Sequence, residues 1–146
     1  MKFQYNDGGR KEAGYKGTAR DCVVRAISIA TCRPYQTVYD DINTMASSER
    51  TSKRKRRKSS SRNGVHKNTI RKYIENLGWK WTPTMQIGSG CTVHLRNGEL
   101  PNGRLIVNLS KHLVAVIDGV INDTSDCSRN GSRCVYGYWS PANNDD

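Results

Sequence analysis

The 146-residue chain is expected to fold as a single α+β domain over residues 1–146, with N-terminal helices packed on a C-terminal antiparallel sheet. In the first half of the chain, apolar residues recur every three or four positions, as they do on helices. In the second half, short extended runs alternate with glycine, proline and asparagine, as in strands joined by turns. Helices that precede strands in this way favour an antiparallel sheet with a helical layer. No break in composition separates two cores, so one domain is expected.

Three helices are expected before the strands begin. The first starts at Asp21, a residue type that caps helix N-termini. The second starts at Pro34, which suits the first helical position, and runs to about Ala46. The third ends at Gly78, because glycine is typical of a helix C-terminal stop.

The segment between the second and third helices, residues 47–63, reads SSERTSKRKRRKSSSRN and has no apolar residue. It cannot offset its ordering entropy by apolar burial, so a mobile basic loop is expected. Residues 49–72 carry 11 of the 24 Lys and Arg and one of the 13 acidic residues, which leaves the rest of the chain nearly neutral. No aromatic side chains interleave with the charges, so any nucleic acid or other anionic partner would be bound without sequence preference, mainly through phosphate or similar groups. The candidate anion-binding residues are Lys53, Arg54, Lys55, Arg56, Arg57 and Lys58.

The strand pattern after Gly78 contains one hairpin whose register can be derived. Asp118-Gly119 lies between two β-rich runs and predicts a two-residue type I′ turn. With that turn, directly paired residues share a face, and Asp123 projects on the same side of the sheet as His112. Asn122 projects on the other side. The extended runs themselves are WKWTPTM, RLIVNLS, HLVAVI, VINDT and CVYGYW.

Three residues form the candidate catalytic group. Cys22 falls in the first turn of the first helix, where the helix dipole and unpaired amide groups lower a thiol pKa. His112 opens an otherwise apolar strand and could act as base, and Asp123 could orient its ring. A lone cysteine near an apolar helix face is more often a buried core residue, and His112 and Asp123 taken singly could also be structural. The joint placement of His112 and Asp123, derived without reference to Cys22, favours the catalytic interpretation.

The order Cys, His, Asp, with the nucleophile on an early helix, resembles that of papain-like cysteine peptidases, and the DC motif at Asp21-Cys22 is similar to that of small bacterial leader-peptide-processing members. The stretches DCVVRAISIAT, PYQTVYDDIN, LGWKWTPTM, RLIVNLSKHLVAVIDGVINDT and CVYGYW look like a widespread group of uncharacterised phage and bacterial proteins, themselves similar to papain-like hydrolases in fold and triad. This resemblance implies a papain-like fold, a phage or prophage origin, and a thiol hydrolase that acts on a peptide or protein substrate by acyl transfer. The alternative is a non-catalytic papain-like scaffold that binds nucleic acid or another anionic partner through the basic loop.

The resemblance also implies an oxyanion hole, half of which the backbone amide of Cys22 would provide. Papain-like peptidases place a glutamine about six residues before the nucleophile as the other donor. Lys16 occupies that position here, so Thr18 and Gln4 are the candidates for the missing donor.

The chain has five cysteines, and no apolar run long enough to span a membrane or to act as a secretory signal. We therefore expect a cytoplasmic protein, in the host cytoplasm if phage-encoded, without membrane contact and with its cysteines as free thiols. Cys32 is expected to pack in the core. No cofactor is expected, and the alternative is a structural zinc site formed by Cys91, His94, Cys127 and Cys134.

Overall fold

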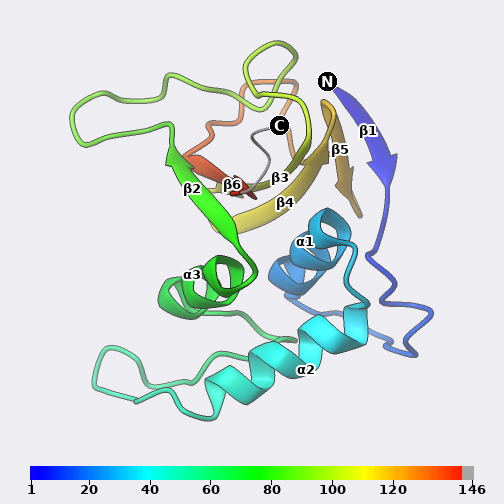
Figure 1. Cartoon of the computed structure of the whole chain (residues 1–146), viewed down its shortest axis with the longest axis vertical. Coiled ribbons are helices and arrows are strands. Elements are labelled where there is room, and N and C mark those ends of the chain that lie inside the picture. Colours follow the sequence, from blue (N-terminus) through cyan, green and yellow to red (C-terminus); the bar gives the residue numbers. More distant parts are fainter. Residues whose placement is uncertain (143–146) are drawn as a thin grey trace.

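Three helices lie together on one side of a six-stranded mixed sheet in the computed structural model, which describes residues 1–142 (Figure 1). Within this part of the chain, no helix is long and apolar enough to cross a membrane. The helices are α1 (Cys22–Thr31), α2 (Tyr35–Ala46) and α3 (Lys67–Asn76). The strands are β1 (Lys2–Tyr5), β2 (Trp79–Pro83), β3 (Arg104–Leu109), β4 (His112–Ile117), β5 (Val120–Asp123) and β6 (Gly137–Pro141).

The three predicted helices are all present, with ends close to those expected. Helix α1 begins directly after Asp21. Pro34 is the cap residue before α2 and not its first helical residue, with the extended backbone that its ring favours (φ −57°, ψ 142°). Gly78 follows α3 with a φ of +87°, the left-handed conformation that glycine adopts without steric cost.

The sheet has the strand order β1-β5-β4-β3-β6-β2. The four pairs among β2 to β6 are antiparallel, whereas β1 pairs with β5 in parallel. The expectation of a purely antiparallel sheet was therefore wrong, because the N-terminal stretch KFQY was not recognised as a strand. The sequence KFQY does alternate polar and aromatic residues, but over only four positions, and all four side chains are exposed at the sheet edge.

The hairpin between β4 and β5 has the predicted turn and register. Asp118 and Gly119 have φ values of 48° and 78°, as a type I′ turn requires. Ala115 pairs with Asn122, and the other pairs follow in the expected order. Asn122 uses its amide locally, donating to the Val120 carbonyl at 3.0 Å.

The sheet is buried on both faces, each against a different layer. On one face the helices cover Ile106 and Ala115 of the central strands. On the other face Val107 and Val114 pack beneath irregular segments that contribute Leu95 and Val135. Helix α1 is the layer next to the sheet, and α2 lies behind it (Figure 1), so Cys22 is placed where the helical layer meets the end of the central strands.

The basic loop, residues 47–63, is fastened to the body at its C-terminal end. Residues 51–58 are exposed, but Ser59 and Ser61 are buried. The Ser61 N–H donates to Oδ1 of Asn43 at 3.0 Å, and its hydroxyl donates to the Tyr39 carbonyl at 2.6 Å. Hydrogen bonds from Ser61 to α2 therefore anchor the loop. The sequence did not indicate this attachment, because the loop has no apolar residues to pack.

Candidate active site

Cys22 is the first residue of α1 and is half-buried beside the helix-side core. The first turn of a helix exposes backbone N–H groups and carries a partial positive charge, which favours a thiolate there. Leu113, the second residue of β4, lines the same pocket as Cys22. Helix α1 and strand β4 thus meet at this thiol.

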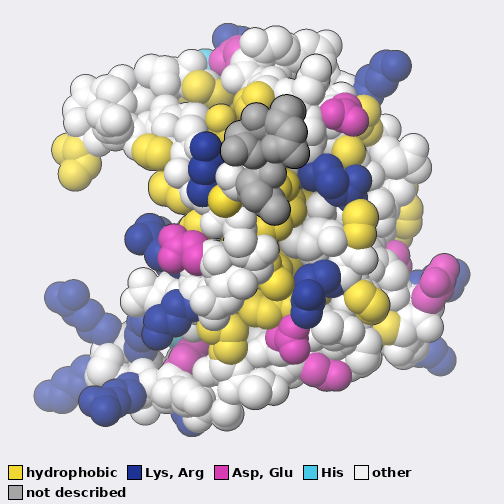
Figure 2. Space-filling model, in the orientation of Figure 1, with side chains coloured by type: hydrophobic (Ala, Val, Ile, Leu, Met, Phe, Trp, Pro, Cys, Tyr) yellow, Lys and Arg dark blue, Asp and Glu magenta, His cyan; other side chains and the backbone are white. Residues whose placement is uncertain are grey.

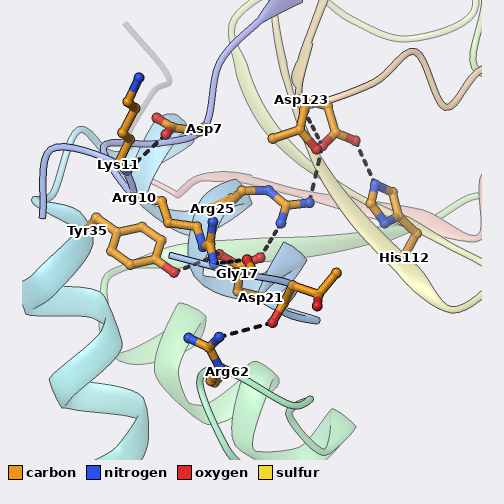
Figure 3. Close-up of polar contacts among 12 residues, drawn as sticks. Asp7, Arg10, Lys11, Gly17, Asp21, Arg25, Tyr35, Arg62, His112 and Asp123 are labelled. Atoms are coloured by element: carbon orange, nitrogen blue, oxygen red, sulfur yellow. Dashed lines mark hydrogen bonds and ion pairs between the residues drawn. The ribbon is translucent and has the colours of Figure 1, made fainter. Parts of the chain in front are cut away.

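His112 and Asp123 lie side by side where β4 begins and β5 ends. The His112 Nε2 atom donates to Oδ2 of Asp123 at 2.7 Å (Figure 3). The other carboxylate oxygen accepts the Thr124 N–H at 2.7 Å. Because Nε2 is engaged by the carboxylate, Nδ1 is the ring nitrogen that can serve a thiol.

The electrostatics of the group favour a charged Cys22–His112 pair. Burial raises the pKa of the Cys22 thiol, but the hydrogen bond and charge of His112, with help from Arg25, outweigh it and hold that pKa below its usual value. Burial lowers the pKa of His112, but hydrogen bonds with Asp123, Cys127 and Cys22 raise it to about 11. Near neutral pH these shifts favour a thiolate beside an imidazolium, the protonation state of an activated thiol nucleophile.

Arg25 connects this group to a second buried carboxylate, that of Asp21, which was expected to cap α1. Its guanidinium forms ion pairs with Asp21 and, at 3.3 Å, with Asp123 (Figure 3). Asp21 also forms an ion pair with Arg10, whose Nε lies 3.3 Å from Oδ2, and accepts a hydrogen bond from the Tyr35 hydroxyl at 2.6 Å.

Asp21 is the N-cap residue of α1, as expected, but its side chain makes no capping hydrogen bond, because its oxygens are occupied by these partners. The sequence contained one indication of the Asp21–Arg25 ion pair. Their i, i+4 spacing places opposite charges on one helix face.

Cys127 is a second thiol at the site that sequence reasoning missed. Ligand atoms of His112, Asp123 and Cys127 lie within 4.8 Å of one another. These donor types could hold a divalent cation. However, the two Asp123 oxygens already accept from Arg25, Thr124 and His112, and the Arg25 charge opposes a cation, so this group fits a hydrogen-bonded network better.

The predicted zinc site of Cys91, His94, Cys127 and Cys134 does not assemble. Cys91 and Cys134 form a disulfide with their Cα atoms 5.9 Å apart, because a bridge between His94 and Cys134 aligns their two segments. Cys127 lies at His112 instead.

The expectation of five free thiols was therefore wrong for Cys91 and Cys134, while Cys22, Cys32 and Cys127 remain free. Cys32, expected in the core, is exposed, because it ends α1 in a left-handed conformation.

The structure does not bring either predicted oxyanion side chain to Cys22. Gln4 is exposed on the edge strand β1, and its amide donates to the Tyr5 carbonyl at 3.1 Å. Thr18 lines a separate depression on the other side of Arg20, and its carbonyl accepts from Arg62 at 3.1 Å. Among the candidates, only the backbone amide of Cys22 remains at the site.

Cys22 and His112 open into a pocket of about 500 Å³. Helices α1 and α3, the turn between β3 and β4, and residues 63–65 of the loop before α3 form its walls. A pocket of this size is typical of sites for small ligands or single side chains of a larger substrate. The thiol is therefore accessible from a defined cavity.

No protein-family model, curated protein or solved structure matches this chain. The chemistry of the site is accordingly inferred from its own residues. A thiol with a lowered pKa, an imidazole in contact with it and a carboxylate on the far ring nitrogen are the groups that acyl transfer to sulfur requires.

Proposed function

We propose that this protein is a papain-like cysteine hydrolase, in which Cys22 attacks the carbonyl of an amide, thioester or isopeptide bond. The observation that carries the proposal is the position of His112, which is bonded through Nε2 to Asp123 and lines the same pocket as Cys22, whose thiol pKa it lowers. The reaction class is acyl transfer, and a peptide or protein is the expected substrate.

In the proposed mechanism, the Cys22 thiolate adds to the carbonyl carbon, and the backbone N–H of Cys22 stabilises the resulting oxyanion. The His112 imidazolium then donates a proton to the leaving amine or thiol as the C–N or C–S bond breaks. An acyl group remains on the sulfur. Neutral His112 next removes a proton from water, which attacks the thioester and releases the acid, and Asp123 keeps the ring oriented throughout.

A papain-like arrangement is supported by how the elements meet. The thiol begins a helix that packs on the sheet, while the histidine and the acid lie on adjacent antiparallel strands. This agrees with the resemblance seen in the sequence motifs. The disulfide and the parallel edge strand β1 are additions to the arrangement that the resemblance implied.

The proposal predicts fast alkylation of Cys22 by iodoacetamide at pH 6, because the thiolate is the reactive form and the Cys22 pKa is lowered. Cys32, which is free and exposed, provides a reference thiol in the same molecule. In His112→Ala the pKa of Cys22 rises, and its alkylation at pH 6 should slow by up to about tenfold for each unit of pKa, because the thiolate fraction falls. Peptide mass spectrometry measures both rates.

His94→Ala serves as the control, since His94 lies beside the Cys91–Cys134 disulfide, and should leave the Cys22 rate unchanged. If Cys22 reacts no faster than Cys32 in the wild type, and equally slowly in His112→Ala, the thiol is not activated and the hydrolase proposal fails.

The second candidate is a non-catalytic scaffold that binds nucleic acid or another anionic partner. The observation in its favour is the uninterrupted exposure of residues 51–58, which include the six cations of KRKRRK. Loss of anion binding on neutralising these charges, together with an unreactive Cys22, would favour this function over hydrolysis.

A further inference from the structure

The pocket beside Cys22 combines an aliphatic wall with a cationic rim. Helix α1, helix α3 and the β3–β4 hairpin contribute the wall, and three cations come from three different places in the fold. Arg20 precedes α1, Lys67 begins α3, and Lys111 lies in the turn between β3 and β4. The wall consists of Val23, Val65, Ile70, Leu109 and Leu113.

The charges of this rim are not neutralised by the described part of the protein. Arg20, Lys67 and Lys111 have exposed side chains, and none of the three forms an ion pair with residues 1–142. Among residues 1–142, no aspartate or glutamate lines the pocket. Arg10 and Arg25, in contrast, form ion pairs. Arg10 pairs with buried Asp21, and Arg25 pairs with Asp21 and Asp123.

We infer that the acyl group accepted by this pocket carries a carboxylate next to an aliphatic side chain, so that the substrates are acidic peptides. The aliphatic side chain would be buried against Ile70 and Leu113, and the carboxylate would lie among the three cations. A nucleic acid fits the pocket less well, because stacking of bases needs aromatic surfaces, and among the described lining residues only Tyr136 and the His112 imidazole are aromatic. The assignment of this substrate class rests on the proposed role of Cys22.

A pair of reagents of nearly equal size tests the charge preference. Iodoacetate is an anion and iodoacetamide is neutral, so the ratio of their alkylation rates at Cys22 reports the local potential independently of thiol reactivity. A unit charge about 7 Å from a reacting anion changes its rate about threefold in a water-like dielectric. Lys67→Glu and Lys111→Glu, which reverse a charge, should each lower the iodoacetate-to-iodoacetamide ratio about sevenfold at low salt.

Lys80→Glu is the matched control, because Lys80 is an exposed cation on β2 outside the pocket. The same change of net charge there should leave the ratio within twofold of the wild type. Both pocket variants replace exposed residues, and their thermal unfolding midpoints establish that they fold.

Peptidyl vinyl sulfones then test the substrate class directly. Two probes share a leucine and differ only in an adjacent glutamate or lysine. The glutamate probe should label Cys22 faster in the wild type, and the order should reverse in the Lys67→Glu, Lys111→Glu double variant.

The outcomes separate the two proposals. Slow alkylation of Cys22 by both small reagents overturns the hydrolase proposal. Fast alkylation with the same rate ratio in wild type and pocket variants overturns only the acidic-peptide assignment. Protection of Cys22 by a short oligonucleotide, without any preference for the glutamate probe, would also overturn it and identify phosphate as the anion that the rim binds.

Discussion

At the scale of single residues, Arg25 holds the candidate active site together. It lies on the first turns of α1, one turn after Asp21, and reaches Asp123 at the end of β5. The side chains of both carboxylates are at most 5% exposed, so neither is screened by water, and the guanidinium is the charge they share. Arg25 thereby fixes the helix that carries Cys22 against the strand that carries Asp123.

Arg25→Gln should lower the free energy of unfolding by about 3 kcal/mol, because it leaves two buried carboxylates without their common cation. Chemical denaturation at pH 7 measures the loss. Arg33→Gln is the matched control, since its ion pair with Asp41 is more than one-third exposed on both sides and should contribute less than about 1 kcal/mol. Equal effects of the two substitutions would contradict the bridging role of Arg25.

The sequence was informative about the placement of His112 beside Asp123 and much less so about their surroundings. A turn motif at Asp118-Gly119 sufficed to place Asp123 beside His112, because strand pairing is periodic once one turn is known. Cys127 follows β5 in an irregular segment, where no periodicity relates a residue to the strands. Its proximity to His112 depends on the path of that loop, which local patterns do not determine.

At the scale of elements, the packing of β6 against β2 leaves no room for a side chain at Gly137. A Cβ atom added to Gly137, its first residue, would lie 2.3 Å from Cζ2 of Trp81 on β2 and 2.9 Å from the Thr82 carbonyl oxygen. Trp81 also contacts Trp139 of β6, with ring centroids 5.0 Å apart. The absence of a side chain at Gly137 thus allows the indole to lie across the strand.

Gly137→Ala should destabilise the protein by about 2 kcal/mol or more, because the methyl group cannot be accommodated without moving Trp81 or the β2 backbone. Thermal and urea unfolding measure the change, and a shift in tryptophan fluorescence would accompany it. Ser140→Ala on the same strand adds no atoms and should change stability by less than about 0.5 kcal/mol. A neutral Gly137→Ala would show that β6 and β2 are less tightly packed than described.

The elements best predicted from sequence are those with a buried face. Helices α1 to α3 and strands β3 to β5 carry apolar residues at the spacing of their own structure, so they could be located. β6 was expected in CVYGYW but begins only at Gly137. Cys134, at the start of that run, is held instead by its disulfide with Cys91 and its bridge with His94. The strand β1 alternates polar and aromatic residues over only four positions and has no buried face, so its pattern was too short to locate it.

At the scale of the whole molecule, the positive charge is gathered on one projection. Figure 2 shows Lys and Arg side chains grouped where the loop between α2 and α3 extends from the body. The projection is exposed over residues 51–58 and anchored at Ser61. Its charges can therefore be altered without removing the residues that attach it.

Replacing the six cations of residues 53–58 with serine or glutamine should leave the unfolding midpoint nearly unchanged and remove most binding to heparin or DNA. The slope of log K against log salt concentration, which is negative for the wild type, should become less steep by up to about 5. Neutralising Lys2, Lys11 and Lys80, which lie elsewhere on the surface, should have a much smaller effect. Unchanged heparin binding in the loop variant would show that the loop is not the anion-binding surface.

The pairing of β1 with β5 sets the order in which the fold can be completed during synthesis. Residues 2–5 are synthesised well before their partners, residues 120–123. Contacts between such distant segments form late, because the intervening chain must be present before they can close. Since β5 also carries Asp123, the nascent chain contains Cys22 without its histidine and acid until residues 112–123 have been made as well.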